Sequence, residues 1–467
     1  MVIKHITGNK TTTQLISGNS ATTWKLDADA RITTGSDFYA LTDYNMKTGA
    51  VASGQPIIVA GDITAKQQQA VGLYGIHDLT IAATSVIKAQ SGAIQLNATE
   101  SGNHIINNGS IRSTTSSAIS SEGSFSVENN GTISAIQGIR FIVENGRKTL
   151  TLTNGEDGAI TCSDWGAQLS GSAKIDNQGT ISAMVGIGIT KGTLNLVNSG
   201  SIESSNSSIR AEADNFRITN EKSGAMSGTV AIYSTGDDGI IKNYGTITSD
   251  NEGVELSGAS DLINMKSGTI DASIIGVRLL HASASVTNNG TIDSGGRGVT
   301  MEAAKTVLTN SGQIDAVGYA VDIAATGSKI VNQTNGNIHS DSYAVMFSYG
   351  SGKSTFTNEG TVTSSGGYAV YDADGITTVV NKGSITGDIS LGNRADTFRN
   401  SGGTVTGTIY GGAGDDLYVV DKTSLTLLEF DGQGKDTVRS SVSWTLGTGF
   451  ETLELTGSGA ISAYGND

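Results

Sequence analysis

The sequence predicts an all-β protein, built as a right-handed, single-chain parallel β-helix (solenoid) with about 22 residues per coil. Three observations lead to this prediction. An asparagine-centred turn returns at a nearly constant interval, and the segments between turns alternate apolar and polar residues, which is the period of a strand. The composition, with 63 Gly, one Pro and 5% aromatic residues, does not suit an ordinary globular core. The right hand follows from the general preference of parallel crossovers.

The repeat is visible in near-copies such as NNGTISAIQGI from Asn129, NQGTISAMVGI from Asn177 and NSGQIDAVGYAV from Asn310. The thirteen steps of the aligned series average about 22.5 residues, and a fixed period in this range is typical of a solenoid. The aligned residues are Asn107, Asn129, Asn154, Asn177, Asn198, Asn220, Asn243, Asn264, Asn288, Asn310, Asn332, Asn358, Asn381 and Asn400.

Each coil contains three short strand-like pieces, which in residues 285–301 read SVTN, TID and GVTM. Such pieces cannot form a stable sheet alone, but stacking coils about 4.8 Å apart pairs each piece with its copy in the next coil. The asparagine side chains are expected to stack and to hydrogen-bond along the axis. The second piece contributes an inward isoleucine: Ile111, Ile133, Ile181, Ile202, Ile247, Ile270, Ile292, Ile314, Ile338 and Ile385.

The open ends of a solenoid expose sheet edges and require caps. We therefore expect an N-terminal cap in residues 1–25, β-helix coils in residues 26–405, and a different C-terminal region in residues 406–467. The last residues, GND, are expected to continue into a longer natural chain.

The formal net charge of −15 argues against nucleic acid as a partner and favours cations, because phosphate binding needs clustered Lys and Arg. The single Cys162 excludes an intramolecular disulfide framework, so an extracellular chain needs another stabiliser, such as calcium. The N-terminus lacks the apolar core of a signal peptide, and nowhere do 18 apolar residues run together. The sequence therefore predicts a soluble chain without a membrane span.

A calcium signal appears where the repeat changes. Residues 411–419, GGAGDDLYV, fit the nonapeptide G-G-x-G-x-D-x-U-x with Asp416 at the Asp position. Asp396 and Asp436 occupy the same phase one coil before and one coil after Asp416, so the three carboxylates are expected to stack beside glycine-rich turns. Carboxylate and carbonyl oxygens are the ligands that Ca²⁺ prefers. The alternative is that these are only tight Gly-Asp turns of the solenoid.

Residues 406–467, which include GGAGDDLYVVD and GQGKDTVRSSVSWTLGTGFETLELTGSGAI, resemble the calcium-binding repeats of RTX (hemolysin-type) secreted proteins. The preceding coils are similar to repeats of bacterial surface proteins and autotransporter passengers. The resemblance implies one-step secretion from a Gram-negative bacterium to the cell surface or medium. It also implies that Ca²⁺ is held by the side chains of Asp416 and Asp436 with backbone around Gly411, Gly412, Gly414, Gly432 and Gly434. Arg394 occupies a usual glycine position near Asp396.

One column of outward residues raises the question of enzymatic activity. Asp271, Asp293 and Asp315 follow the inward isoleucine in consecutive coils, and His339 follows them. Carboxylates about 5 Å apart repel one another, which invites a cation or a raised pKa. A glycan lyase or hydrolase could use such a group, with Arg278 and Arg297 in the same coils available to neutralise it. The alternative is a polar, solvent-facing row. The other histidines, His5, His77, His104 and His281, predict no site.

Tyr319, Tyr343 and Tyr368 recur before Ala-Val in three successive coils. Stacked outward tyrosines can form a platform for sugar rings, or can serve only to stabilise the sheet by packing on one another.

Together these patterns predict a secreted, calcium-binding surface or matrix protein, such as an adhesin, a biofilm component or an S-layer-like building block. Its expected partners are cell-surface or matrix polysaccharide, or further copies of itself. The alternative is a β-helix lyase, epimerase or hydrolase acting on acidic glycans. The short loops between coils argue against an enzyme, since active clefts on such folds are usually walled by long loops.

Overall fold

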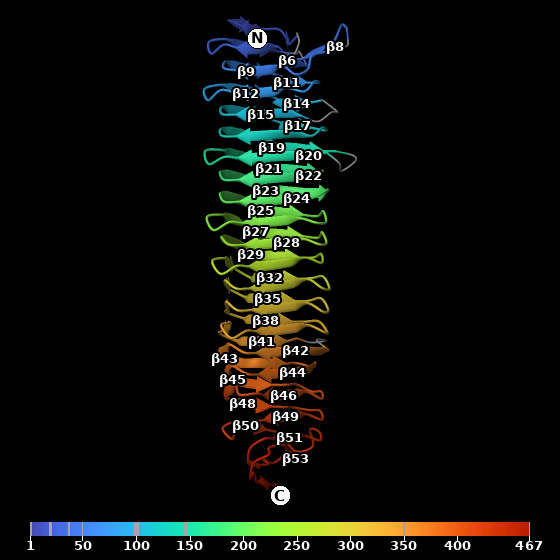
Figure 1. The fold of residues 1–467 in the computed structure, drawn as a ribbon, viewed down its shortest axis with the longest axis vertical. Coiled ribbons are helices and arrows are strands. Elements are labelled where there is room, and N and C mark those ends of the chain that lie inside the picture. The colour runs from blue at the N-terminus through green and yellow to red at the C-terminus, as the bar shows by residue number, and fades with distance from the viewer. Residues whose placement is uncertain are drawn as a thin grey trace. The chain divides into compact units, whose positions relative to one another are not determined.

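The fold is seen in a computed structural model, which describes residues 2–17, 21–35, 38–48, 50–97, 102–143, 148–348 and 352–466. Across these ranges the regular elements are all β-strands, and they include no helix long and apolar enough to cross a membrane. The chain forms two compact units, Met1–Asp237 and Asp238–Asp467, and each is a parallel β-solenoid (Figure 1). The predicted all-β parallel fold is confirmed, and so is its coil length, since stacked asparagines such as Asn107 and Asn129 are 22 residues apart.

In the first unit two sheets run along the stack of coils. The first sheet contains β1 (Val2–Ile6), β4 (Thr22–Leu26), β9 (Pro56–Val59), β12 (Asp78–Ile81), β15 (Asn103–Asn107), β18 (Phe125–Asn129), β20 (Thr149–Asn154), β22 (Ser172–Asn177), β24 (Leu194–Asn198) and β26 (Arg217–Asn220). The second contains β2 (Asn9–Lys10), β3 (Gln14–Leu15), β5 (Arg31–Thr34), β6 (Tyr39–Thr42), β10 (Asp62–Ala65), β11 (Gln69–Leu73), β13 (Val86–Ala89), β14 (Ile94–Leu96), β16 (Ser110–Ser113), β17 (Ser117–Ser121), β19 (Thr132–Ile142), β21 (Ala159–Ser170), β23 (Thr180–Lys191), β25 (Ser201–Ala211) and β27 (Ala225–Ser234).

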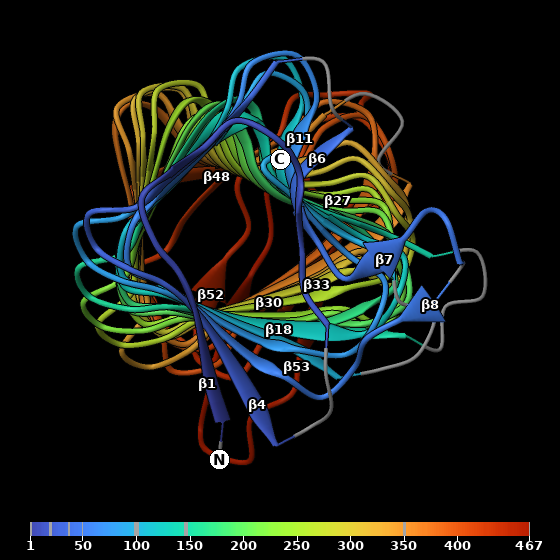
Figure 2. The same cartoon turned by 90° about the horizontal axis from the view of Figure 1, so that it is seen from above.

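The N-terminal segment is itself a coil. β1 pairs in parallel with β4, from Val2 opposite Thr22 to Ile6 opposite Leu26, so the region expected to cap the unit also continues its sheet. A short antiparallel pair, β7 (Tyr44–Asn45) and β8 (Ala50–Val51), projects from the side of the coil (Figure 2).

The second unit repeats this design. Its first sheet contains β28 (Ile240–Asn243), β30 (Asp261–Asn264), β33 (Ser285–Asn288), β36 (Val307–Asn310), β39 (Lys329–Asn332), β42 (Lys353–Asn358), β44 (Ile376–Asn381), β46 (Thr397–Asn400), β49 (Leu417–Val420), β51 (Thr437–Ser440) and β53 (Thr452–Leu455). Its second contains β29 (Thr246–Leu256), β31 (Thr269–Ala272), β32 (Ile275–Leu279), β34 (Thr291–Ser294), β35 (Arg297–Met301), β37 (Gln313–Ala316), β38 (Tyr319–Ile323), β40 (Asn337–Ser340), β41 (Tyr343–Phe347), β43 (Thr361–Asp372), β45 (Ser384–Ser390), β47 (Thr404–Thr406), β48 (Thr408–Tyr410) and β50 (Thr426–Leu428). A small pair, β52 (Trp444–Thr445) and β54 (Ala463–Tyr464), follows.

The three predicted pieces of a coil correspond to the strands. In the coil of residues 285–301, SVTN is β33, TID lies in β34 and GVTM lies in β35. The second and third pieces belong to one sheet and not to two, because in other coils a single long strand such as β19 or β43 runs through both of them.

A ladder of asparagines forms one corner of each unit. Fourteen aligned asparagines from Asn107 to Asn400 are at most 3% exposed. Asn288 Nδ2 donates to Asn310 Oδ1 at 2.8 Å, and the same bond recurs from coil to coil within each unit. In the second unit the ladder ends where Asn400 Nδ2 donates to Asp421 Oδ1 at 2.5 Å. An acceptor-only side chain suits that last position, since the next coil has Ser441 there in place of an asparagine.

The core of each unit is a stack of like residues. The inward isoleucines from Ile111 to Ile385 are fully buried, as predicted, and Val299 and Met301 of the third piece are buried with them. Burying each such side chain stabilises the fold by about 1.5 to 3 kcal/mol before the loss of chain entropy.

Unit 1 also contains a buried histidine–aspartate pair that the sequence did not predict. His77 Nε2 lies 2.9 Å from Asp43 Oδ2, and both side chains are inaccessible to solvent. Asp43 also accepts hydrogen bonds from the backbone of Tyr74 and Gly75. Asp43 and His77 are 34 residues apart, so no local motif marks the pair. These contacts hold the segment after β6 to the next coil, which is a structural role.

Candidate metal centre

The predicted aspartates form a column at the N-terminal ends of three late strands of the first sheet. Asp396, Asp416 and Asp436 each immediately precede a strand, β46, β49 and β51 respectively. Asp416 Oδ1 accepts a hydrogen bond from the backbone nitrogen of Asp396 at 2.7 Å, and Asp436 Oδ1 accepts one from that of Asp416 at 2.9 Å. One oxygen of each carboxylate therefore joins successive coils, and the other remains for a different partner.

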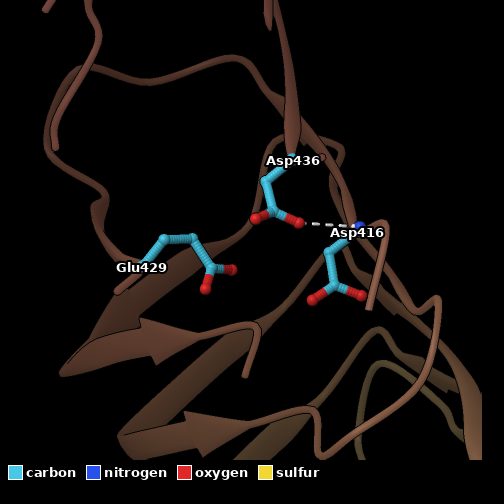
Figure 3. Close-up of side chains that lie close together, drawn as sticks. All are labelled: Asp416, Glu429 and Asp436. Atoms are coloured by element: carbon cyan, nitrogen blue, oxygen red, sulfur yellow. Dashed lines mark hydrogen bonds between the residues drawn. The ribbon is translucent and has the colours of Figure 1, made fainter. Parts of the chain in front are cut away.

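Two of these aspartates lie close to a third carboxylate. Ligand atoms from Asp416, Glu429 and Asp436 lie within 4.8 Å of one another (Figure 3). These side chains are 2%, 4% and 0% exposed, and Asp416 Oδ2, Glu429 Oε2 and Asp436 Oδ2 have no hydrogen-bond partner among the described residues. Buried carboxylates without partners are costly unless a cation compensates them. We call these three residues the acidic triad.

Glu429 is the member of the triad that the sequence analysis missed. It follows β50 and is held by Tyr418, whose hydroxyl donates to Glu429 Oε1. It lies outside the nonapeptide positions and has no acidic counterpart one coil before it or after it, so spacing does not reveal it. The one hint of its role in the sequence is its position among the apolar residues Leu427, Leu428 and Phe430. A charged residue is rarely buried among apolar ones unless it has a partner.

Glycines make room for the acidic triad. A Cβ on Gly411 would lie 1.9 Å from both Glu429 Oε1 and the Tyr418 hydroxyl, so only glycine fits there. Gly412 and Gly414 adopt positive φ of 92° and 133°, which suits glycine. A Cβ on Gly434 would lie 1.8 Å from the carbonyl oxygen of Gly414, so these two turns stack closely. Gly432 also has a positive φ of 83°, but nothing lies near its missing side chain.

The three predicted aspartates do not all lie at one place. Asp416, Asp436 and Gly411 lie together at the acidic triad. Asp396 lies one coil away and is not part of it, although its Oδ2 is also buried without a partner among the described residues. Arg394 contacts the backbone oxygen of Asp374 through Nε at 3.1 Å.

Burial is the main cause of altered acidity in the column. It raises the pKa of Asp416 to about 6 and that of Glu429 to about 7, with added repulsion from Asp436 in both cases. It raises the pKa of Asp396 to about 8, with further repulsion from Asp372 and Asp416, and it also raises the pKa of Asp436. These groups therefore keep their protons to higher pH than ordinary carboxyl groups do, and a bound cation would oppose this by favouring the ionised form.

The metal-free protein is therefore expected to lose thermal stability as the pH rises from about 5 to 8. Carboxyl groups of the unfolded chain titrate near pH ~4, below the raised pKa values of Asp416, Glu429 and Asp396 in the fold. Between these limits the folded state holds more protons, so the free energy of unfolding falls with increasing pH. Melting temperatures measured in chelator at several pH values test this. A melting temperature that rises over the same interval would contradict it, and an Asp416→Asn, Glu429→Gln double variant should show a flatter profile.

The second predicted column is assembled but open to solvent. Asp271, Asp293 and Asp315 are register partners in β31, β34 and β37, and all three are exposed. Burial, followed by repulsion from Asp271 and Asp315, raises the pKa of Asp293. His339 continues the column, with Nδ1 2.8 Å from Asp315 Oδ1.

The two arginines expected to neutralise that column have other partners. Arg278 pairs with Glu302 at 2.9 Å and with Glu252 at 3.1 Å. Arg297 pairs with Asp322 at 3.4 Å and lies over the ring of Tyr319.

The three predicted tyrosines do form a row. The Tyr319 and Tyr343 rings are 5.5 Å apart in an edge arrangement, and those of Tyr343 and Tyr368 are 6.1 Å apart and stacked at 17°. All three rings are half-buried.

Comparison with known proteins gives little further guidance. No protein-family profile and no solved structure matches the chain. A segment of 60 residues is 42% identical to part of the endo-1,3-1,4-beta-glycanase ExsH of Rhizobium meliloti (strain 1021), which amounts to 13% of this chain and 13% of that protein. The likeness thus spans a small part of the relative's length, and a family is not defined by it.

Proposed function

We propose that this protein is a calcium-binding structural solenoid whose acidic triad holds Ca²⁺. The observation that carries the proposal is the convergence of three buried carboxylates, Asp416, Glu429 and Asp436, each of which has one oxygen without a hydrogen-bond partner among the described residues. Ca²⁺ takes several oxygen ligands from flexible sites, whereas Mg²⁺ demands a tight octahedron and keeps its water. Bound calcium would neutralise the repulsion among the triad and join the coils that carry β49 and β51.

The proposed location is the cell surface or its matrix. The triad lies in the region that resembles RTX repeats, and repeats of that kind belong to secreted proteins. A calcium-stiffened solenoid on the cell surface or in its matrix would act as an adhesin, a biofilm component or an S-layer-like unit.

Titration calorimetry of the full chain, freed of metal with chelator and dialysed, tests the calcium site. Ca²⁺ should bind with a Kd of about 10⁻⁶ to 10⁻³ M, since ligand charge and site rigidity tune affinity over such a range. Mg²⁺ should bind more weakly. Glu429→Gln should lower calcium affinity tenfold or more, whereas Asp431→Asn, which changes an exposed carboxylate of the same loop, should not. If the Glu429→Gln variant bound Ca²⁺ as tightly as the unchanged protein, the acidic triad would not be the calcium site.

A glycan-degrading enzyme is the second candidate. It is supported by the alignment of Asp271, Asp293 and Asp315, by the raised pKa of Asp293, and by the partial match to a glycanase. In such an enzyme, a protonated Asp293 would serve as an acid beside an ionised neighbour. Release of sugar ends from polyuronates and other glycans, lost on Asp293→Asn, would establish it. If none of those substrates were cleaved, the enzymatic candidate would be rejected and the structural proposal retained.

A further inference from the structure

A groove in unit 2 borders the acidic triad, and its lining includes none of the aspartates of the exposed column. It has a volume of about 330 Å³ and lies over β43, β45, β48 and β50. Its walls combine aromatic rings with side-chain amides, chiefly from Tyr368, Tyr371, Tyr410, Phe430, Asn393 and Gln433.

The register of the strands explains why a groove forms here. Tyr371 is opposite Ser390, and Ser390 is opposite Tyr410, so the three residues stand in one column of consecutive coils. Coils are about 4.8 Å apart, so the two tyrosines are about 10 Å apart along the stack. The serine between them has a small side chain, so the column is not filled at that coil, and we call this place the slot.

Two of the aromatic rings of the groove, those of Tyr368 and Tyr371, pack against neighbouring rings. The Tyr368 and Tyr371 rings are 5.3 Å apart, and Tyr371 also packs against Tyr343 at 5.5 Å. Tyr343 in turn stacks on Tyr368. Rings that are fixed before binding lose little conformational entropy when a ligand arrives.

The polar groups of the groove define the chemistry of its ligand. The lining includes two side-chain amides, those of Asn393 and Gln433, and an amide can both donate to and accept from hydroxyl groups. The lining contains no Lys or Arg among the described residues, and its one acid, Asp372, is occupied by hydrogen bonds from the Gly375 nitrogen and the Thr377 hydroxyl. The site therefore favours an uncharged ligand with hydroxyl groups and a flat apolar face.

We infer that this groove binds a sugar unit of a neutral polysaccharide, with the ring between Tyr371 and Tyr410. The C–H face of a hexose packs on an aromatic ring, while its hydroxyl groups hydrogen-bond to amides such as those of Asn393 and Gln433. The inference does not depend on the metal. One wall, residues 428–433, also carries Glu429, so calcium should be held constant in any test.

Calorimetry of the full chain with cellohexaose, laminarihexaose and maltohexaose, at constant millimolar calcium, tests the inference. At least one of these neutral hexasaccharides should bind. Tyr410→Ala, which removes a stacking wall, and Ser390→Trp, which fills the slot, should each weaken binding tenfold or more. Tyr319→Ala, in the tyrosine row but outside the groove, should bind as the unchanged protein does.

The outcomes separate this inference from the calcium proposal. Calcium titration of the same variants should be unchanged, and their melting curves should show that they fold. Failure of all three neutral sugars to bind, binding of polygalacturonate alone, or equal binding by Tyr410→Ala and Ser390→Trp would overturn the saccharide site. Loss of binding on Tyr319→Ala with retention on Tyr410→Ala would also overturn it, because the ligand would then lie outside the groove.

Discussion

Adding calcium to the metal-free protein is expected to raise its melting temperature by roughly 5 to 10 °C at a calcium concentration near 100 times the Kd. A ligand of the folded state at that excess stabilises it by about 2.7 kcal/mol. In a unit of this size each kcal/mol corresponds to about 2 to 4 °C. The physical source would be the acidic triad, whose carboxylates each have a buried oxygen without a partner among the described residues and would be compensated by a cation. Scanning calorimetry with calcium and then with excess chelator measures the shift.

Two variants make this result specific. Asp436→Asn should remove most of the calcium-dependent shift, because the triad loses a charged ligand but keeps its shape. Asp431→Asn, on the exposed part of the same loop, should keep the full shift. Identical melting curves with calcium and with chelator in the unchanged protein would contradict the calcium site, as would a shift that persists in Asp436→Asn.

Replacing Asn288 by alanine is expected to lower the free energy of unfolding by about 3 kcal/mol or more. Asn288 accepts from Asn264 Nδ2 at 2.8 Å and donates to Asn310 Oδ1 at 2.8 Å and to the Gln313 carbonyl at 2.9 Å. The alanine leaves these buried groups without their partner, and each unsatisfied group costs about 1 to 3 kcal/mol. Chemical denaturation followed by circular dichroism measures the loss.

Two further variants separate hydrogen bonding from packing. Asn288→Asp keeps the volume but cannot donate to Asn310 Oδ1, so it should also be strongly destabilising. Asn289→Ala removes a half-buried neighbour whose side chain accepts from Ser311 Oγ at 2.7 Å, and should cost less than about 1 kcal/mol. If Asn288→Ala were as stable as Asn289→Ala, the ladder would contribute nothing to the stability of the unit.

Part of the candidate metal centre was predictable from spacing. Asp416 and Asp436 lie 20 residues apart, and in a solenoid one coil of separation in sequence becomes one strand of separation in space. Glu429 was not predictable in this way. It lies directly after β50 and is held at the triad by the Tyr418 hydroxyl, and a segment without a repeated counterpart gives no register from which to place it.

The groove, like Glu429, could not be predicted from the repeat alone. Tyr319, Tyr343 and Tyr368 share a repeated phase and were recognised as a row, but Tyr371 and Tyr410 were not paired until the register placed Ser390 between them. A groove forms where a small side chain lies between larger ones in the adjacent coils. Which side chains are adjacent is known only once the strands are in register.

The sequence by itself determined the parallel solenoid, its coil length, its asparagine corner and its isoleucine core. It could do so because each coil pairs with its own copy, so that repetition specifies the contacts. Only the tertiary structure decided the buried pair of Asp43 and His77, the place of Glu429 in the acidic triad, and the slot over Ser390. Each of these depends on residues that break the repeat, and their contacts follow from how coils and loops pack in space.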